Sequence, residues 1–241
     1  MKYFGKKWLA LLLAAAAAAV FSACGASEAP SSAAESSAEQ SQESPASSGE
    51  TPAADSAAED EDGGILIAYF TAAENSGVDA VASASYTMIG DEAVGRLQAV
   101  ADMIGEATGG DLFSIRTSVV YPADGGELID YAAQEQDEDA RPELTSHIEN
   151  LEQYDTIFVG YPNWWGDMPQ ALYSFFDEYD FSGKTIVPFN VHNGSRFSRT
   201  IQTIQELEPD ADVIEDGFTV NERDAAEAGE DVAAWLEELG Y

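Results

Sequence analysis

The chain has 241 residues, enough for one domain or two small ones, and its 45% hydrophobic and 10% aromatic residues can form a substantial core. Only 10 Lys and Arg stand against 45 Asp and Glu, which gives a formal net charge of -35. A surface this acidic repels nucleic-acid phosphates and anionic lipid headgroups, which excludes nucleic-acid binding. The acidity indicates a solubility feature or, alternatively, a docking face for a basic partner.

The first 23 residues have the pattern of a secretory signal peptide. Three lysines among the first seven residues precede an apolar run over residues 8–21, which is short for a membrane span. Small residues then lead to Cys24, the only cysteine of the chain. This arrangement resembles the lipobox of bacterial lipoproteins, whose cysteine is diacylated and becomes the mature N-terminus. The resemblance implies that Cys24 anchors the mature chain at the extracytoplasmic face of the cell membrane; the alternative is an incidental cysteine.

Residues 24–63 have a different composition, rich in Ser, Ala, Glu, Gln, Pro and Asp. This segment contains no aromatic residue, lysine or arginine, and its acidic side chains repel one another. Such a segment cannot bury enough apolar surface to offset the entropy that it would lose on ordering. We therefore expect a disordered tether that holds the following domain away from the membrane.

From residue 64 to the end, short apolar runs alternate with amphipathic stretches. Strands are expected over residues 64–70, 112–116, 156–161, 184–190 and 212–220. Helices are expected around residues 94–104, 128–135, 142–151, 168–179, 199–207 and 223–239. Strands that alternate with helices five times predict one α/β domain over residues 64–241, a doubly wound five-stranded parallel sheet with helices on both faces.

The loop after the third predicted strand, residues 160–169, carries the adjacent Trp164 and Trp165. Ligands of open α/β sheets bind beyond the carboxyl ends of the strands, where the strand order reverses. Indole faces stack well on flat aromatic ligands, and the Gly and Asn residues of the loop let backbone groups approach the edge of a ring. We expect one of the two tryptophans to pack in the core and the other to serve a ligand.

The loop after the fourth predicted strand, residues 191–199, opens a helix. Its glycine and polar side chains suit the polar edge of a ring, and His192, Arg196 and Arg199 would place positive charge at a helix N-terminus. His192 could equally be structural. His147 is expected on a surface helix as a structural or solvated residue, and we predict neither a catalytic nucleophile nor a specific metal site.

The strings over residues 65–71, 154–171 and 179–195 resemble the flavodoxin-like family of bacterial proteins, most specifically in the motif Gly-Tyr-Pro-x-Trp-Trp-Gly. The resemblance implies an FMN cofactor, strand order 2-1-3-4-5, and electron transfer or flavin-dependent reduction. It assigns one side of the flavin to Pro162, Asn163, Trp164, Trp165 and Gly166, and the other edge to His192, Asn193, Gly194 and Ser195.

The phosphate loop departs from the family pattern, which is a compact Ser/Thr-rich loop with Gly-Asn-Thr after the first strand. Here Thr71 is followed by Ala72, Ala73 and Asn75, a long insertion follows, and Gly95-Arg96-Leu97 falls where Gly-Asn-Thr is expected. Arg96 would compensate by direct charge pairing with a phosphate, whereas Glu74 would repel it.

Three functions are compatible with these features. The first is an FMN-binding electron-transfer protein at the outer face of the cytoplasmic membrane, with a redox protein or a small quinone-like acceptor as its partner. The second is an NAD(P)H-dependent quinone or flavin reductase in which Arg196 or Arg199 receives the phosphates of the cofactor; the acidic surface disfavours that anionic substrate. The third is a flavin-free binding module that has kept the fold.

Overall fold

The computed structural model describes residues 63–76 and 86–241, so the expected signal peptide, Cys24 and nearly all of the tether lie outside the described residues. The strands are β1 Gly64–Tyr69, β2 Tyr86–Ile89, β3 Glu92–Gly95, β4 Asp111–Ser114, β5 Tyr154–Pro162, β6 Thr185–His192, β7 Asp212–Val213 and β8 Phe218–Asn221. The helices are α1 Arg96–Thr108, α2 Gly125–Asp137, α3 Gln170–Glu178, α4 Thr200–Leu207 and α5 Gly229–Leu239. No helix in this part of the chain is both long and apolar enough to cross a membrane.

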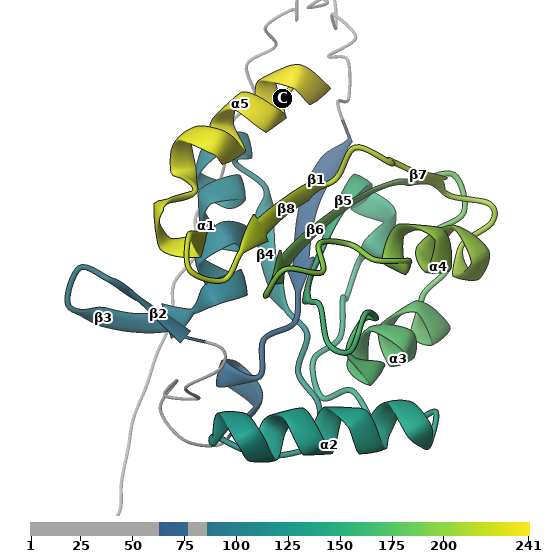
Figure 1. Cartoon of the computed structure of the whole chain (residues 1–241). Helices are drawn as coiled ribbons and strands as arrows, with labels where there is room; N and C mark the ends of the chain where they lie inside the picture. The colour runs from purple at the N-terminus through teal and green to yellow at the C-terminus, as the bar shows by residue number, and fades with distance from the viewer. Residues whose placement is uncertain (1–62, 77–85) are drawn as a thin grey trace, which may run out of the picture. The chain divides into compact units, whose positions relative to one another are not determined.

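The main sheet is parallel and has the order β4-β1-β5-β6-β7, with β8 also paired to β6 (Figure 1). This is the predicted 2-1-3-4-5 order, with the fifth strand divided into β7 and β8. In register, Ile67 of β1 lies between Leu112 of β4 and Phe158 of β5. The chain between β7 and β8 passes so close to β6 that a Cβ on Gly217 would lie 2.4 Å from the carbonyl oxygen of Pro188.

Two hydrophobic layers cover the sheet because successive strand residues point to opposite faces. Ile67 and Phe158 face α1 and α5 and pack with Ile104 and Leu236. On the opposite face, Leu66, Val159 and their neighbours pack against α3 and α4. Helix α2 lies across the carboxyl edge of the sheet (Figure 1), which is where the candidate site is found.

The helix predicted over residues 142–151 is absent from the structure. This segment instead runs antiparallel beside the chain that follows β4, with a bridge between Thr117 and Leu144. The amide of Ser118 donates to the carbonyl of Glu143, and the hydroxyl of Ser146 donates to the carbonyl of Ser114. Tertiary partners therefore override the local helical pattern.

The segment before α1 also differs from the prediction. Val94 was expected in the helix but lies in β3, the second strand of a hairpin that projects from the domain (Figure 1). Helix α1 begins only at Arg96. Val94 and Leu97 are three residues apart, which matches helical spacing, so the sequence pattern placed the start of the helix before its actual start at Arg96.

Candidate functional site

A cavity of about 300 Å³ lies at the carboxyl ends of β1, β5, β6 and β8 and is bordered by α2 and the start of α1. Its lining combines apolar, aromatic and polar side chains: Thr71, Ala72, Arg96, Leu97, Leu128, Ile129, Ala132, Pro162, Asn163, Trp164, Trp165, Val191, His192, Asn193 and Glu222. A largely apolar hollow with a few polar groups, at the end of a parallel sheet, is the usual form of a small-molecule site.

Trp165 occupies a tight turn at the cavity. Trp164 and Asp167 exchange two backbone hydrogen bonds of 2.9 Å, and the two residues between them, Trp165 and Gly166, have φ angles of 54° and 81°. Positive φ is uncommon for a bulky side chain, and it is compatible with a type I′ turn. Trp165 is 60% exposed, and its Nε1 donates to the carbonyl of Ile129 on α2.

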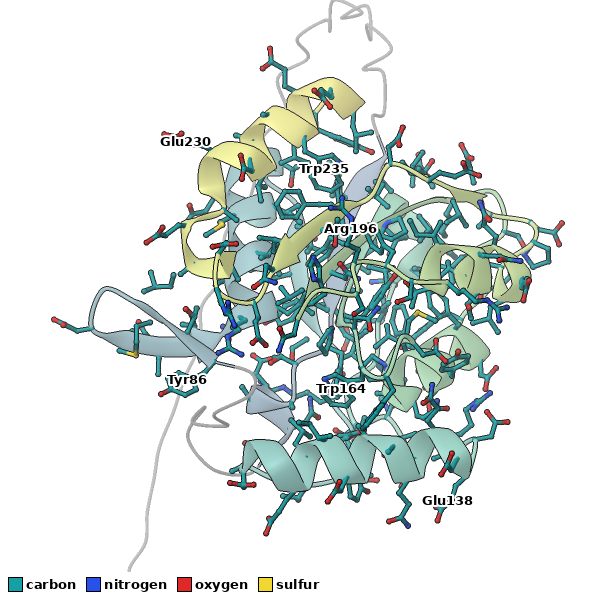
Figure 2. All side chains as sticks on the ribbon, viewed as in Figure 1. Tyr86, Glu138, Trp164, Arg196, Glu230 and Trp235 are labelled. Atoms are coloured by element: carbon teal, nitrogen blue, oxygen red, sulfur yellow. The ribbon has the colours of Figure 1, made fainter. Side chains whose placement is uncertain are left out.

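Trp164 faces the interior instead. Its ring makes edge contacts with Phe70, at a centroid distance of 5.7 Å, and a tilted contact with Tyr121 at 5.9 Å. Figure 2 places Trp164 between the end of the sheet and α2. Trp164 is therefore the tryptophan that packs on the core, whereas Trp165 is presented to the surface, and both line the cavity.

Asp167, which closes the turn, was missed by the sequence analysis. Its carboxylate accepts hydrogen bonds from the Tyr173 hydroxyl at 2.9 and 3.0 Å and from the backbone amide of Met168 at 2.8 Å. Gln136 of α2 also donates to it at 3.4 Å. Desolvation, together with this bond to the Asp167 carboxylate, raises the pKa of Tyr173, so the phenol remains a donor at every ordinary pH. The turn is therefore fixed to both α2 and α3.

Asn163 connects the two loops of the site. Its Nδ2 donates to the carbonyl of Arg196 at 2.8 Å, which also accepts from Asn190 at 2.9 Å, and its Oδ1 accepts from the amide of Gly166. Arg196 therefore supplies a backbone oxygen at a positive φ of 51°. Neither Arg196 nor Arg199 lines the cavity, so the positive charge expected from them at this site is not found there.

His192 ends β6, and its Nδ1 accepts a hydrogen bond of 2.7 Å from the amide of Gly194. The proton of the neutral ring therefore belongs on Nε2. Desolvation lowers the pKa of His192, the charge of Arg196 lowers it further, and Glu222 opposes both effects. The lowered pKa favours the neutral ring, so the geometry gives no support to the expected positive charge on His192.

Some residues of the loop after β1 line the cavity, and others hold the loop in place. Thr71 and Ala72 line the cavity. Asn75 is buried and points inward, where its Nδ2 donates to the carbonyls of Thr71 and Ile115 and its Oδ1 accepts from the amide of Thr117. Asn75 thus holds the loop rather than a ligand. Ala73 likewise supports the loop, since its amide donates to the Thr71 hydroxyl at 3.3 Å.

Glu74 lies outside the cavity lining, which removes the main objection to an anion at this loop. Its carboxylate accepts hydrogen bonds from the hydroxyls of Ser114 and Tyr69. Arg116 lies 3.6 Å from the same carboxylate. The expectation that Glu74 would repel a bound phosphate is therefore not supported by the geometry.

Arg96 opens α1 beside the loop, and its Nη1 lies 3.3 Å from Oε2 of Glu222. Gly95 lets the start of α1 lie close to Thr71, because a Cβ on Gly95 would be 2.7 Å from Oγ1 of Thr71. No side chain caps the first turn of α1, so its backbone N–H groups and the helix dipole favour an anion. Arg96 and this helix end are therefore the groups of the cavity that could pair with an anion, although Glu222 already contacts the guanidinium.

The structure therefore brings together most of the expected residues. Gly95, Gly166, Gly194 and Ser195 do not line the cavity, although Gly95, Gly166 and Gly194 shape it through backbone contacts. Leu97 and Val191, which lie in segments expected at the site, also line the cavity, whereas Glu222 and the α2 residues Leu128, Ile129 and Ala132 were not expected there. Within residues 63–76 and 86–241, no group of three or more His, Cys, Asp or Glu residues is placed to hold a metal ion. His147 lies in a loop rather than a helix, and its Nδ1 is 2.7 Å from the Glu178 carboxylate.

The sheet order and the cavity together define a flavodoxin-like α/β domain with a ligand site at the carboxyl edge of its sheet. The family model for flavodoxin matches residues 85–239, which is well over half of the chain. The chain therefore belongs to the flavodoxin family. No curated protein sequence matches it significantly.

Solved structures similar to this chain include two assigned as flavoproteins. The one from Bacteroides eggerthii is 26% identical with a TM-score of 0.56, over 75% of this chain and 99% of that one. The one from Bacteroides uniformis is 26% identical with a TM-score of 0.57, over 73% and 98% of the two chains. A flavoprotein from Lactobacillus acidophilus in complex with FMN is 16% identical with a TM-score of 0.48, over 70% and 99%.

Proposed function

We propose that this chain is a flavoprotein that binds FMN in the cavity at the carboxyl edge of its sheet. The observation that carries the proposal is Trp165, which is held at a positive φ with its indole exposed beside the cavity. A strained backbone and an exposed tryptophan both cost stability, so their coincidence at one cavity indicates a role in binding a flat aromatic ligand. Membership of the flavodoxin family supports FMN as that ligand.

The residues of the cavity fit the parts of FMN. The indole of Trp165 and the apolar side chains of Leu128 and Ile129 suit the ring system, and His192 and Asn193 suit its polar edge. Arg96 with the start of α1 suits the phosphate. A cavity of about 300 Å³ is at the lower end of the range for ligand sites, so we expect part of the flavin to stay at the surface.

We further propose that the protein transfers electrons between partners at the cell surface. Bound FMN supplies one- and two-electron redox chemistry, while the chain binds it, orients it and excludes water from one face. The acidic character of the chain disfavours added negative charge on the flavin and so lowers its reduction potential. The absence of Arg196 and Arg199 from the cavity lining weighs against a nicotinamide dinucleotide as the reductant. A redox protein or a small quinone-like acceptor is the partner that we favour.

Anchoring through Cys24 is the second part of the proposal. It rests on the lysines and apolar run of residues 1–23 and on the single cysteine that follows them. A Cys24→Ser variant, produced in a bacterial host that processes lipoproteins, is expected to lose the labelled fatty acid that the wild-type chain incorporates. Equal incorporation of the label into that variant would contradict an anchor at Cys24.

Titration of the purified chain with FMN tests the proposed cofactor. We expect the visible flavin bands to shift and the flavin fluorescence to be quenched, because the ring leaves water and stacks on an indole. Unchanged spectra at a large excess of FMN would overturn the proposal and favour a flavin-free binding module. NAD(P)H added to the loaded protein separates the two flavin functions, since rapid bleaching would indicate a reductase.

A further inference from the structure

Arg96 is the only residue with a permanent positive charge among those that line the cavity in the described part of the chain. Burial and the charge of Arg196 lower the pKa of His192, the other basic lining residue, which disfavours its charged form. A ligand phosphate that enters the cavity therefore depends on Arg96 for its charge pairing. However, the Arg96 guanidinium already lies 3.3 Å from the Glu222 carboxylate.

Glu222 is held in place by its own backbone. It follows β8 directly, where Asn221 pairs in register with His192, and its amide donates to the carbonyl of His192 at 2.8 Å. Its carboxylate therefore belongs to the carboxyl edge of the sheet and cannot retreat far from the cavity. The side chains of Arg96 and Glu222 are 20% and 26% exposed, so water reaches both and the pair can rearrange.

The two charges cancel at the place where an anion would bind. A phosphate of charge near −2 must either share the guanidinium with the carboxylate or displace it, and in both cases the repulsion between the two anions opposes binding. A flavin without a phosphate makes no demand on Arg96 and meets no such repulsion. The stacking surface formed by Trp165 and α2 is the same for both ligands.

We propose that Glu222 is a specificity-determining residue that competes with the ligand phosphate for Arg96, so that the site discriminates only weakly between FMN and riboflavin. This inference rests on the proposed function, namely that a flavin binds in this cavity. It adds a property of this chain's own residues, since the carboxylate sets how much affinity the phosphate can contribute.

The test compares the Kd values of FMN and riboflavin, measured by fluorescence quenching, for the full chain and for Glu222→Gln. We expect the wild type to bind the two flavins within about tenfold of each other, and Glu222→Gln to increase the preference for FMN by a further tenfold or more. Glu238→Gln is the matched control, because Glu238 is an exposed residue near the end of α5, at the opposite edge of the sheet. It should leave the preference within twofold of the wild type.

Arg96→Met and the double variant with Glu222→Gln separate competition from general repulsion. If Glu222 acts through Arg96, the gain from Glu222→Gln falls below about threefold once Arg96 is absent. A gain of the same size in both backgrounds would overturn competition for Arg96. Glu222→Ala provides a second removal of the charge should Glu222→Gln fold poorly, as judged by near-UV circular dichroism.

The failure of this inference differs from the failure of the proposed function. If the wild type binds neither flavin, the flavin site itself is refuted. If the wild type binds riboflavin but Glu222→Gln and Glu222→Ala leave the FMN preference unchanged, Glu222 does not determine specificity, although the site stands. A wild-type preference for FMN of a thousandfold would also overturn the inference.

Discussion

The two ends of the cavity are built in different ways. Around Trp165, hydrogen bonds from three directions fix the loop: Asn163 to the Arg196 carbonyl, Trp165 to α2, and Asp167 to Tyr173 of α3. At the start of α1, the helix follows a projecting hairpin, and an ion pair with the partly exposed Glu222 occupies its first side chain.

The two ends of the cavity are therefore suited to different parts of a ligand. A loop held by several hydrogen bonds is ordered before the ligand arrives, so stacking there costs little further entropy. The Arg96–Glu222 ion pair is only partly buried, so water reaches it and the guanidinium can exchange one anion for another. We therefore expect ring binding to be strong and insensitive to conditions, and binding of the anionic part to depend on charge.

The largest effect should come from Trp165→Ala. Loss of the indole should weaken FMN binding by about 3 kcal/mol, on the order of a hundredfold in Kd, because a desolvated aromatic anchor carries much of the affinity at such a site. Trp235→Phe is the control, since Trp235 belongs to α5 and packs on Phe158 and Phe218, away from Trp164 (Figure 2). Fluorescence titration measures both variants, and a loss below threefold for Trp165→Ala would contradict a stacking role.

The stability of the fold should depend on pH through Glu135, which holds the Tyr121 ring that packs against Trp164. Glu135 is buried and accepts hydrogen bonds from the hydroxyl of Tyr121, while Tyr131 and Glu138 lie nearby. Desolvation raises the pKa of Glu135 to about 7. In the folded state Glu135 keeps its proton up to about pH 7, whereas in the unfolded chain it releases the proton near the lower, ordinary pKa of a glutamate. The resulting stabilisation is fully present below that ordinary pKa and is lost as the pH rises toward 7.

Glu135→Gln should remove part of this dependence. Between pH 5 and 8 we expect the wild type to lose on the order of 2 kcal/mol more unfolding free energy than the variant, as measured by urea denaturation. Glu208, whose pKa desolvation also raises to about 7, should leave a remaining slope in Glu135→Gln. Parallel pH profiles for the two proteins would show that Glu135 ionises normally in the fold.

Asp167→Ala should loosen the turn. It removes the acceptor of Tyr173 and of the Met168 amide, and we expect a loss of about 1.5 kcal/mol in unfolding free energy. Tyr173→Phe removes only the shared hydroxyl bond and should cost about half as much, because Asp167 keeps its other donors. Urea midpoints of the two variants test the order, and equal losses would mean that the Met168 and Gln136 bonds contribute nothing.

The smallest expected effect is the difference in stability between two variants of Trp165, which measures the backbone strain at this residue. Trp165→Gly and Trp165→Ala both delete the indole, but only glycine adopts the positive φ of 54° without a Cβ penalty. The glycine variant should therefore be more stable than the alanine variant by about 1 kcal/mol, although both bind FMN poorly. Paired urea unfolding curves measure this difference, and a more stable alanine variant would argue against strain.

The strands of the sheet and the edge that carries the site could be predicted from local patterns in the sequence. The strand over residues 64–70 is apolar on both faces, as buried parallel strands are, and its alternation with amphipathic helices defines the sheet. Because the carboxyl ends of parallel strands share one edge, two loops far apart in sequence, at Trp164 and at His192, could be placed at one site. Their residues do line one cavity.

The rest required long-range contacts that leave little trace in a local pattern. Residues 142–151 have a helical periodicity, but the chain after β4 offers them an antiparallel partner. Glu74 lies in the expected phosphate loop, but its carboxylate contacts Ser114 and Arg116 and does not line the cavity. Glu222, more than a hundred residues from Arg96, meets it only because β8 pairs with β6.

The sequence by itself determined the α/β class, the strand order that the family resemblance implied, and the edge of the sheet where the site lies, because alternation of apolar residues is set by the geometry of strands and helices. Only the tertiary structure decided which charges face the cavity, which tryptophan is exposed, and how α2 closes one side. These features depend on which distant segments pack together, and side-chain direction follows from that packing rather than from the neighbours in the chain.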